Sequence, residues 1–425
     1  SCYNLRDFMK QEMLEIGRLA KEASSILGRT STKLKNQALR DSASIIRGSK
    51  GEILESNNID IDQARKNKLS EAMIDRLVLD DDRVEGIASS LEQISNFEDP
   101  IGKIINEIER PNGLLIQKVK VPLGVIGIIY ESRPNVTADA GALCLKSGNA
   151  VILRGGTESV NSNKIIHSCL IKGLQNTGLP HTSIQMVPTQ DRKAVGILLR
   201  DMTSYVDIII PRGGKNLIAR IQEDARVPVI GHLEGICHTY VHQNADLNMA
   251  KKIILNAKMR RTGICGATET ILIDKSIASK FVTPILDILI SNGCEVRGSK
   301  DIINLDARAI IAKDSDWGKE FLDAIIAIRL VEDIDEALSY IREYGSGHTE
   351  SIVSNDQQAA DKFLAELDSS IVMHNTSTQF ADGGEFGMGA EIGIATGRIH
   401  ARGPVGSEEL TSYKYIVRGK GQIRA

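Results

Sequence analysis

The fold is decided by VIGIIYESRPNVTADAG, residues 125–141, in which an apolar run leads directly into a polar turn with a proline and then into a helical pattern. A strand of consecutive apolar residues is buried on both faces, which is typical of a parallel sheet covered by helices. Similar short runs follow, each separated from the next by a helical stretch, at residues 150–153, 184–187 and 206–210. The repetition predicts a doubly wound α/β lobe.

A second series of the same kind begins at about residue 236. Its apolar runs are ICHTYV, ETILID, AIIAIRLV, ESIVS and SSIVMH, again alternating with helical patterns. A chain of 425 residues is too long for one core, since single cores stop growing at roughly 250–300 residues. We therefore expect two open parallel-sheet, Rossmann-like lobes, with the helical first hundred residues covering one of them.

Two further segments, residues 114–121 and 410–418, alternate polar and apolar residues. This pattern predicts exposed strands that together form an antiparallel flap. The flap could pair subunits across a sheet edge, or it could be a local hairpin that caps one lobe.

Composition excludes several classes of protein. Apolar residues make up 42% of the chain and charged residues 25%, with a net charge of −3 and no extended basic face, so we expect neither nucleic-acid nor membrane binding. The six cysteines show no CxxC pair and no metal-ligand spacing. They are interpreted as free thiols in a cytoplasmic protein, and no metal site is expected.

The segment MRRTGICGATET, residues 259–270, carries the strongest candidate for chemistry. Cys265 stands between two glycines that leave room for a substrate carbonyl, and Arg260 and Arg261 would favour its thiolate. The alternative is a buried cysteine that acts as a small hydrophobe, which suits Cys144, Cys169 and Cys237 better.

Polar residues follow the predicted strands of the first lobe. Asn135 comes after the strand 125–130, where its amide could donate to an oxyanion or simply cap the next helix. Two other strands end in Arg-Gly-Gly, at Arg154 with Gly155 and at Arg212 with Gly213 and Gly214. Such corners can hold a phosphate at a helix N-terminus, although neither is a G-x-G-x-x-G motif and each could be a plain turn.

Taken together, GICHTYV, NAKMRRTGICGATETILI, EALSYIREYGSGHTESIVS and the glycine-rich DGGEFGMGAEIGIATGRIHARGPVGSEELTSYK resemble the gamma-glutamyl phosphate reductase family, a distant branch of the aldehyde dehydrogenase superfamily. The resemblance runs over nearly the whole chain. It implies an NADPH-binding domain of residues 1–105, 123–235 and 382–405. It also implies a catalytic domain of residues 236–381 and an oligomerisation flap of residues 106–122 and 406–425, in a homodimer or homotetramer.

The reaction implied is the second step of proline biosynthesis, in which NADPH reduces L-glutamate 5-phosphate to L-glutamate 5-semialdehyde with release of phosphate. Cys265 matches the nucleophile of the superfamily, and Asn135 looks like the asparagine of its oxyanion hole. Arg154 looks like the lysine that reaches the adenosine ribose, with a charge suited to a 2′-phosphate. A functional link with glutamate 5-kinase is also expected, and a chain excised from a bifunctional protein could look the same.

One departure agrees with this reaction. Hydrolysing members of the superfamily carry a glutamate base for water where this chain has His232, with Glu234 two residues on. A reductase that forms a thioester has no use for that base. His348, in GSGHTES, is expected to make a structural hydrogen bond.

For the anionic groups of the substrate we expect Asn375 and Ser377, in the loop after SSIVMH, together with Arg398 and Arg402 in the glycine-rich tail. The alternative for the two arginines is pairing with structural carboxylates. Competing functions are another activity of the superfamily, such as an aldehyde dehydrogenase or an acyl-CoA reductase, and a pseudoenzyme with a binding role.

Overall fold

The computed structural model describes residues 2–425, with side chains from residue 8 onward. The chain divides into two compact units. Unit 1 comprises the residues up to Gly231 together with Met388–Gly393 and Val405–Ala425, and unit 2 comprises His232–Gly387 and Ile394–Pro404. The expected division at residues 235 and 382 thus differs in the tail. Strand β14 (Ile394–Ala395) pairs with β15 (Gly403–Pro404), and Ser370 donates to the carbonyl of Ala395, so this segment packs with unit 2.

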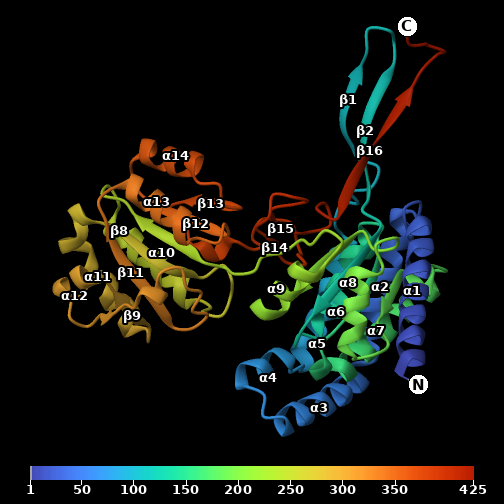
Figure 1. Ribbon diagram of the computed structural model, residues 1–425, viewed down its shortest axis with the longest axis horizontal. Coiled ribbons are helices and arrows are strands. Elements are labelled where there is room, and N and C mark those ends of the chain that lie inside the picture. The colour runs from blue at the N-terminus through green and yellow to red at the C-terminus, as the bar shows by residue number, and fades with distance from the viewer. Residues whose placement is uncertain (1) are drawn as a thin grey trace. The chain divides into compact units, whose positions relative to one another are not determined.

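Unit 1 contains a four-stranded parallel sheet in the order β5-β4-β3-β6, and helices of the same unit lie against this sheet (Figure 1). Its strands are β3 (Val125–Tyr130), β4 (Ala150–Arg154), β5 (Ile184–Met186) and β6 (Ile208–Arg212). Central β3 is buried over its whole length, as its apolar sequence predicts. In the register, Ile129 lies opposite Arg154 and Tyr130 opposite Arg212. Both Arg-Gly-Gly corners therefore flank the turn that follows β3.

Helices occupy the first hundred residues, as predicted. They are α1 (Cys2–Leu27), α2 (Thr32–Gly48), α3 (Lys50–Lys66), α4 (Glu71–Leu77) and α5 (Asp81–Ser95). Ser31, Ser70 and Asp80 cap three of them by accepting a backbone N–H. The helices that alternate with the strands are α6 (Asn135–Lys146), α7 (Val160–Asn176), α8 (Arg192–Arg200) and α9 (Lys215–Asp224), with short 3₁₀ turns at Thr157–Ser159 and His181–Ser183.

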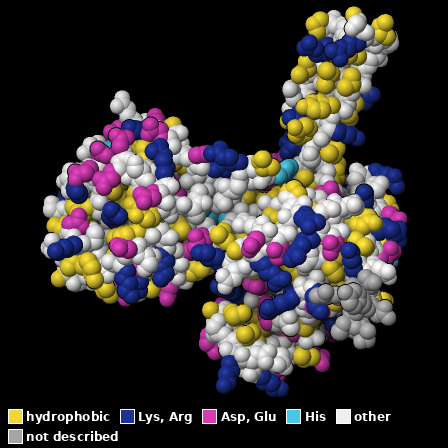
Figure 2. Space-filling view, viewed as in Figure 1, with side chains coloured by type: hydrophobic (Ala, Val, Ile, Leu, Met, Phe, Trp, Pro, Cys, Tyr) yellow, Lys and Arg dark blue, Asp and Glu magenta, His cyan; other side chains and the backbone are white. Residues whose placement is uncertain are grey.

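The flap is a three-stranded antiparallel sheet formed by β1 (Ile104–Glu109), β2 (Leu115–Pro122) and β16 (Thr411–Arg418), with β2 in the centre. Ser412 lies opposite Val121 and Arg418 opposite Leu115, so the two alternating segments pair as expected. Figure 2 shows hydrophobic side chains exposed along this sheet; they include Ile104, Ile105, Ile108, Tyr413, Tyr415 and Val417.

Unit 2 contains a seven-stranded parallel sheet in the order β10-β9-β11-β8-β7-β12-β13. Five strands match predicted runs: β7 (Cys237–Val241), β8 (Thr268–Asp274), β11 (Ile325–Val331), β12 (Thr349–Val353) and β13 (Ile371–His374). Edge strands β9 (Glu295–Gly298) and β10 (Ile310–Ile311) were not predicted, because they are short and β9 is half polar. The fold class is nevertheless confirmed, since both units are built on open parallel sheets.

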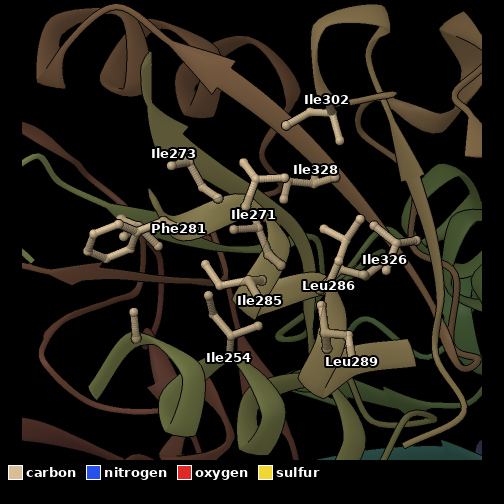
Figure 3. Close-up of a cluster of buried hydrophobic side chains, with 14 of the residues drawn as sticks. Ile254, Ile271, Ile273, Phe281, Ile285, Leu286, Leu289, Ile302, Ile326 and Ile328 are labelled. Carbon is tan, nitrogen blue, oxygen red and sulfur yellow. The ribbon is translucent and has the colours of Figure 1, made fainter. Parts of the chain in front are cut away.

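Successive residues of β8 point to opposite faces of the unit 2 sheet. Ile271 and Ile273 join the core shown in Figure 3, which Phe281, Ile285 and Leu286 of α11 complete. Leu272 belongs to a second core on the other face. The helices of this unit are α10 (Leu247–Met259), α11 (Ala278–Ser291), α12 (Lys300–Leu305), α13 (Ile334–Tyr344) and α14 (Gln357–Glu366), with 3₁₀ turns at Lys275–Ile277, Asp314–Asp316 and Thr378–Phe380. Both faces of the sheet are thus buried.

The five cysteines whose side chains are described form no disulfide, as expected; the side chain of Cys2 lies outside the described residues. Cys144, Cys169 and Cys237 are buried, whereas Cys265 is partly exposed. Among the helices from residue 2 onward, none has both the length and the apolar character needed to cross a bilayer.

Candidate active site

Cys265 lies in the turn between α10 and β8, three residues before the strand begins. Its neighbour Gly266 is buried, and a Cβ on Gly266 would meet the carbonyl oxygen of Thr378 at 3.3 Å. The Thr268 hydroxyl lies 2.9 Å from that of Thr378 and 2.8 Å from that of Thr239. This hydroxyl chain ties the cysteine turn to β7 and to the 3₁₀ turn Thr378–Phe380.

The backbone of Cys265 is held by the segment that enters β7. The Cys237 thiol donates to the Cys265 carbonyl at 3.1 Å, and burial raises the pKa of Cys237 well above its ordinary value, which keeps it a neutral donor. Gly235 packs so closely that a Cβ there would lie 2.3 Å from the Cys265 carbonyl oxygen. The Gly235 N–H in turn donates to the Glu320 carboxylate at 2.7 Å. The backbone of Cys265 therefore rests on a tightly packed support.

Two histidines lie beside the cysteine. One ring nitrogen each of His232 and His348 and the sulfur of Cys265 all lie within 4.8 Å of one another. The two rings meet edge to face, with centroids 5.1 Å apart. Burial, together with the neighbouring His232, lowers the pKa of His348 to about 3, so this ring is neutral at physiological pH.

This cluster occupies the amino ends of neighbouring strands in the order β8-β7-β12. Cys265 precedes β8, His232 precedes β7, and His348 immediately precedes β12. The Arg-Gly-Gly corners of unit 1, by contrast, follow the carboxyl ends of β4 and β6, the edge at which open α/β sheets commonly bind ligands. Cys265 lies instead at the amino edge of the unit 2 sheet.

The two arginines before Cys265 are exposed. Arg260 Nη1 donates to Gln379 Oε1 at 3.4 Å, and Gln379 Nε2 donates to the carbonyl of Arg261 at 2.9 Å. The loop that follows β13 thus packs against the cysteine turn through its last residues.

The structure separates Asn375 from the cysteine cluster. Its side-chain oxygen accepts the Ser354 N–H at 2.9 Å and its Nδ2 donates to the Ser354 carbonyl at 3.0 Å, after the carboxyl end of β12. The chain then turns back across the sheet, so that Ser377, which is buried, lies next to Thr378 near the amino edge. Of the two predicted loop residues, only Ser377 comes near the cysteine turn.

The tail arginines pair with one carboxylate. Arg398 Nη2 contacts the Asp368 carboxylate, and Arg402 donates to Asp368 Oδ1 at 2.8 Å and to its carbonyl at 2.6 Å. The structural-carboxylate alternative therefore describes their contacts in this structure. Arg398 is 75% exposed, so water screens its ion pair with Asp368.

In unit 1, Arg154 curls over the end of β4. Its guanidinium donates to the carbonyl of Gly155 at 2.9 Å and to that of Gln190 at 3.1 Å, while its buried Nε has no hydrogen-bond partner. A pocket of about 190 Å³ adjoins this corner, lined by Gly155, Lys164, His167, Val187 and Gln190 among others. A buried donor without a partner beside a partly polar pocket suits the ribose or phosphate of a nucleotide.

At the corner of Arg212, Gly213 and Gly214, a carboxylate of the chain itself contacts the backbone. The Glu131 carboxylate accepts the Gly214 N–H at 3.1 Å, just before α9, and a Cβ on Gly213 would lie 2.8 Å from Glu131 Oε2. The carboxylate stands where a phosphate oxygen would bind at a helix N-terminus. Arg212 ends β6 next to this corner.

Asn135 is the first residue of α6, and Pro134, not Asn135, precedes the helix. Its Nδ2 donates to Asp139 Oδ2 at 3.1 Å, so the N-cap alternative is wrong. Burial raises the pKa of Asp139 above its ordinary value. This contact uses one of the two amide hydrogens and holds the side chain in one orientation.

Sequence reasoning missed the support of the site. The close approach of Gly235 and the thiol contact of Cys237 both depend on tertiary packing, and LEGICHTYV gives no local sign of either. The partnership of His232 and His348 with Cys265 required the strand order. Lys164 and Gln190 could have been suggested only by their positions after predicted strands.

A sequence model of the aldehyde dehydrogenase family matches residues 3–289. A gamma-glutamyl phosphate reductase of Parvibaculum lavamentivorans is 56% identical over 97% of each chain, and one of Brucella suis is 55% identical over 97% of this chain and 98% of its own. The crystal structure of the reductase of this name from Thermotoga maritima superposes with a TM-score of 0.96 at 42% identity, over 97% of this chain and 100% of that one. The chain belongs to the aldehyde dehydrogenase family and, within it, to the gamma-glutamyl phosphate reductases.

Proposed function

We propose that this chain reduces L-glutamate 5-phosphate to L-glutamate 5-semialdehyde and phosphate with NADPH, the second step of proline biosynthesis. The observation that carries the proposal is Cys265, a partly exposed thiol in a glycine-flanked turn whose backbone is held by Gly235 and Cys237. Such a thiol is accessible to a carbonyl and does not move away from it. Relatives over half identical along nearly the whole chain bear the name of this activity.

In the reaction, the Cys265 thiolate attacks the acyl phosphate carbon and forms a carbon–sulfur bond. The carbonyl oxygen takes up the negative charge, and the Asn135 amide with a backbone N–H donates to it. Collapse of this tetrahedral species breaks the bond to phosphate and leaves a thioester on Cys265. Phosphate is a good leaving group, so this step needs no strong acid.

The residues at the carboxyl edge of the unit 1 sheet fit a dinucleotide. Arg154 and the pocket beside Gly155 would hold the adenosine half, with the unpartnered Nε of Arg154 available to a 2′-phosphate, and the corner of Arg212, Gly213 and Gly214 would hold pyrophosphate in place of the Glu131 carboxylate. When bound, the cofactor would supply a hydride to the thioester carbon. Cleavage of the carbon–sulfur bond would then restore the Cys265 thiolate and release the aldehyde.

The residue at position 232 is one reason why the thioester would not be hydrolysed. Where hydrolysing relatives of the superfamily carry a glutamate base, this chain has His232, and the adjacent His348 is neutral and buried. No carboxylate therefore stands at that position to take a proton from water.

Anionic groups of the substrate would be met by cations and loop groups of unit 2. We assign Arg398 and Arg402 to binding of the substrate's phosphate or α-carboxylate, which would replace Asp368 as their partner. We also assign Ser377, in the loop that borders the cysteine turn, to substrate binding. The exposed apolar side chains of the β1-β2-β16 sheet, such as Tyr415 and Val417, suit subunit pairing in a homodimer or homotetramer.

The test is phosphate-dependent oxidation of glutamate semialdehyde with NADP, combined with trapping of Cys265 by iodoacetamide. Wild type should require phosphate, and L-glutamate 5-phosphate should protect Cys265 from alkylation. Cys265→Ser should abolish turnover while the protein still folds and binds NADPH; full activity in that variant would refute the mechanism. Activity without phosphate, or with coenzyme A in its place, would support the competing superfamily activities.

A further inference from the structure

The cluster of His232, Cys265 and His348 has a property that the reductase chemistry does not use. These residues are 33 and 83 positions apart in sequence, and the order β8-β7-β12 brings them together at one edge of the unit 2 sheet. Their donor atoms all lie within 4.8 Å of one another. Two imidazoles and a thiol at this spacing form a set of metal ligands.

The rings are oriented by contacts through their other nitrogens. His232 Nδ1 lies 2.5 Å from the Ile394 carbonyl, and His348 Nδ1 lies 2.7 Å from Thr349 Oγ1. Nε2 is thereby the nitrogen that each ring offers to the cluster. Contacts of this kind to the second nitrogen are typical of metal-bound histidines, because they set the tautomer and the direction of the lone pair.

The strongest sign is His348 Nε2. The side chain is fully buried, and within the described residues this nitrogen has no hydrogen-bond partner. Buried polar atoms are nearly always satisfied, so an orphaned nitrogen on a ring that lies beside a thiol and a second imidazole indicates a missing ligand.

We propose that His232, Cys265 and His348 form a binding site for Zn²⁺. One thiolate and two neutral imidazoles suit zinc, whereas magnesium and calcium prefer oxygen ligands.

The geometry requires a small adjustment. With Zn–N of about 2.0–2.1 Å and Zn–S of about 2.3 Å, tetrahedral ligands lie roughly 3.4–3.6 Å apart, so a pair at the 4.8 Å limit would have to approach by about 1 Å. Rotation of the partly exposed Cys265 side chain can bring the sulfur closer to the two ring nitrogens. Three protein ligands leave the fourth position to water.

Binding would release the thiol proton to solvent and form a sulfur–zinc bond. The sulfur could not then attack a carbonyl, so zinc would be a reversible inhibitor that occupies the nucleophile. This inference goes beyond the proposed reaction and does not rest on it, because metal binding and thiol protection are measured without turnover.

The experiment uses the full chain after chelator treatment, with ZnCl₂ as the titrant in calorimetry. We expect one Zn²⁺ per chain and alkylation of Cys265 by iodoacetamide, read by peptide mass spectrometry, to slow at least about tenfold at saturation. Cys265→Ser, His232→Ala and His348→Gln should each weaken binding by at least about 100-fold, since loss of even a second-shell partner costs 10–100-fold. The matched control is His181→Ala, an exposed histidine in unit 1, which should leave affinity unchanged.

Three results would overturn the site: no protection of Cys265 by zinc, stoichiometric binding that survives Cys265→Ser, or equal protection in a folded His232→Ala variant. The glutamine of His348→Gln fills most of the volume that the buried imidazole occupies. If His348→Gln nevertheless misfolds, His232→Ala still tests the inference. Equal binding of Mg²⁺ would also count against it.

Discussion

Gly235→Ala tests whether close packing beneath Cys265 positions the nucleophile. A Cβ on residue 235 would lie 2.3 Å from the Cys265 carbonyl oxygen and 2.7 Å from its Cα and Cβ. Ordinary contact begins near 3.4 Å, so the cysteine backbone must move by roughly 1 Å. The carbonyl is also held by the Cys237 thiol at 3.1 Å, so the contact cannot be relieved by a side-chain rotation.

A displacement of about 1 Å at a reacting atom can lower the rate roughly 100-fold. The expected cost in stability is that of overpacking, about 1–3 kcal/mol, which a domain of this size survives. We therefore expect kcat to fall by roughly two orders of magnitude in a protein that still folds. The measurements are steady-state oxidation of glutamate semialdehyde with NADP and phosphate, and urea unfolding of both proteins.

Gly263→Ala is the matched control, because it adds the same methyl group to the same turn where a Cβ would meet nothing within 4 Å. Its kcat should stay within about threefold of wild type. If folded Gly235→Ala also retained wild-type kcat, the contact would not set the position of the sulfur and the reasoning would fail.

Three further outcomes are expected. Asn135→Ala should lower kcat by about 10²–10³ with little change in stability, as loss of one oxyanion donor does, and an unchanged kcat would remove Asn135 from the site. Arg402→Ala should raise the KM for phosphate in the oxidation assay; an unchanged KM would leave this arginine with only its structural pairing to Asp368. His348 has a pKa of about 3 when folded against 6.5 unfolded, so its stabilising contribution is present above pH 6.5 and is lost as the pH falls below it. Between pH 6.5 and 5, urea unfolding should show wild type losing on the order of 1.5 kcal/mol more than His348→Gln, and parallel losses would contradict the neutral buried ring.

The sequence was informative where a residue's role depends on its neighbours along the chain. Continuous apolar runs such as 125–130 predicted the buried parallel strands, since only strands covered on both faces lack polar alternation. The glycines and arginines around residue 265 likewise make Cys265 the candidate nucleophile. Strand β9, with the sequence EVRG, was missed because its pattern resembles a loop and its place in the sheet depends on pairing with β11.

The sequence did not predict features that depend on the order of strands in the sheet. His232 and His348 meet at Cys265 only because β7 lies between β8 and β12, and hydrophobic periodicity carries no information on that order. Asn375 shows that nearness along the chain is not nearness in space. It is only two residues from Ser377, yet the reversal of the chain after β13 leaves it bonded to Ser354 at the other edge of the sheet.

The interleaving of the tail has a practical consequence. The polypeptide passes from one compact unit to the other after residues 231, 387, 393 and 404, so the two units share four covalent junctions. A single protease nick at any one junction would leave the halves tethered, and truncation after residue 387 would remove β16 from unit 1 and both β14 and β15 from unit 2. Neither unit is encoded by one continuous segment of the gene. Fragments designed for complementation must therefore combine several segments of the chain.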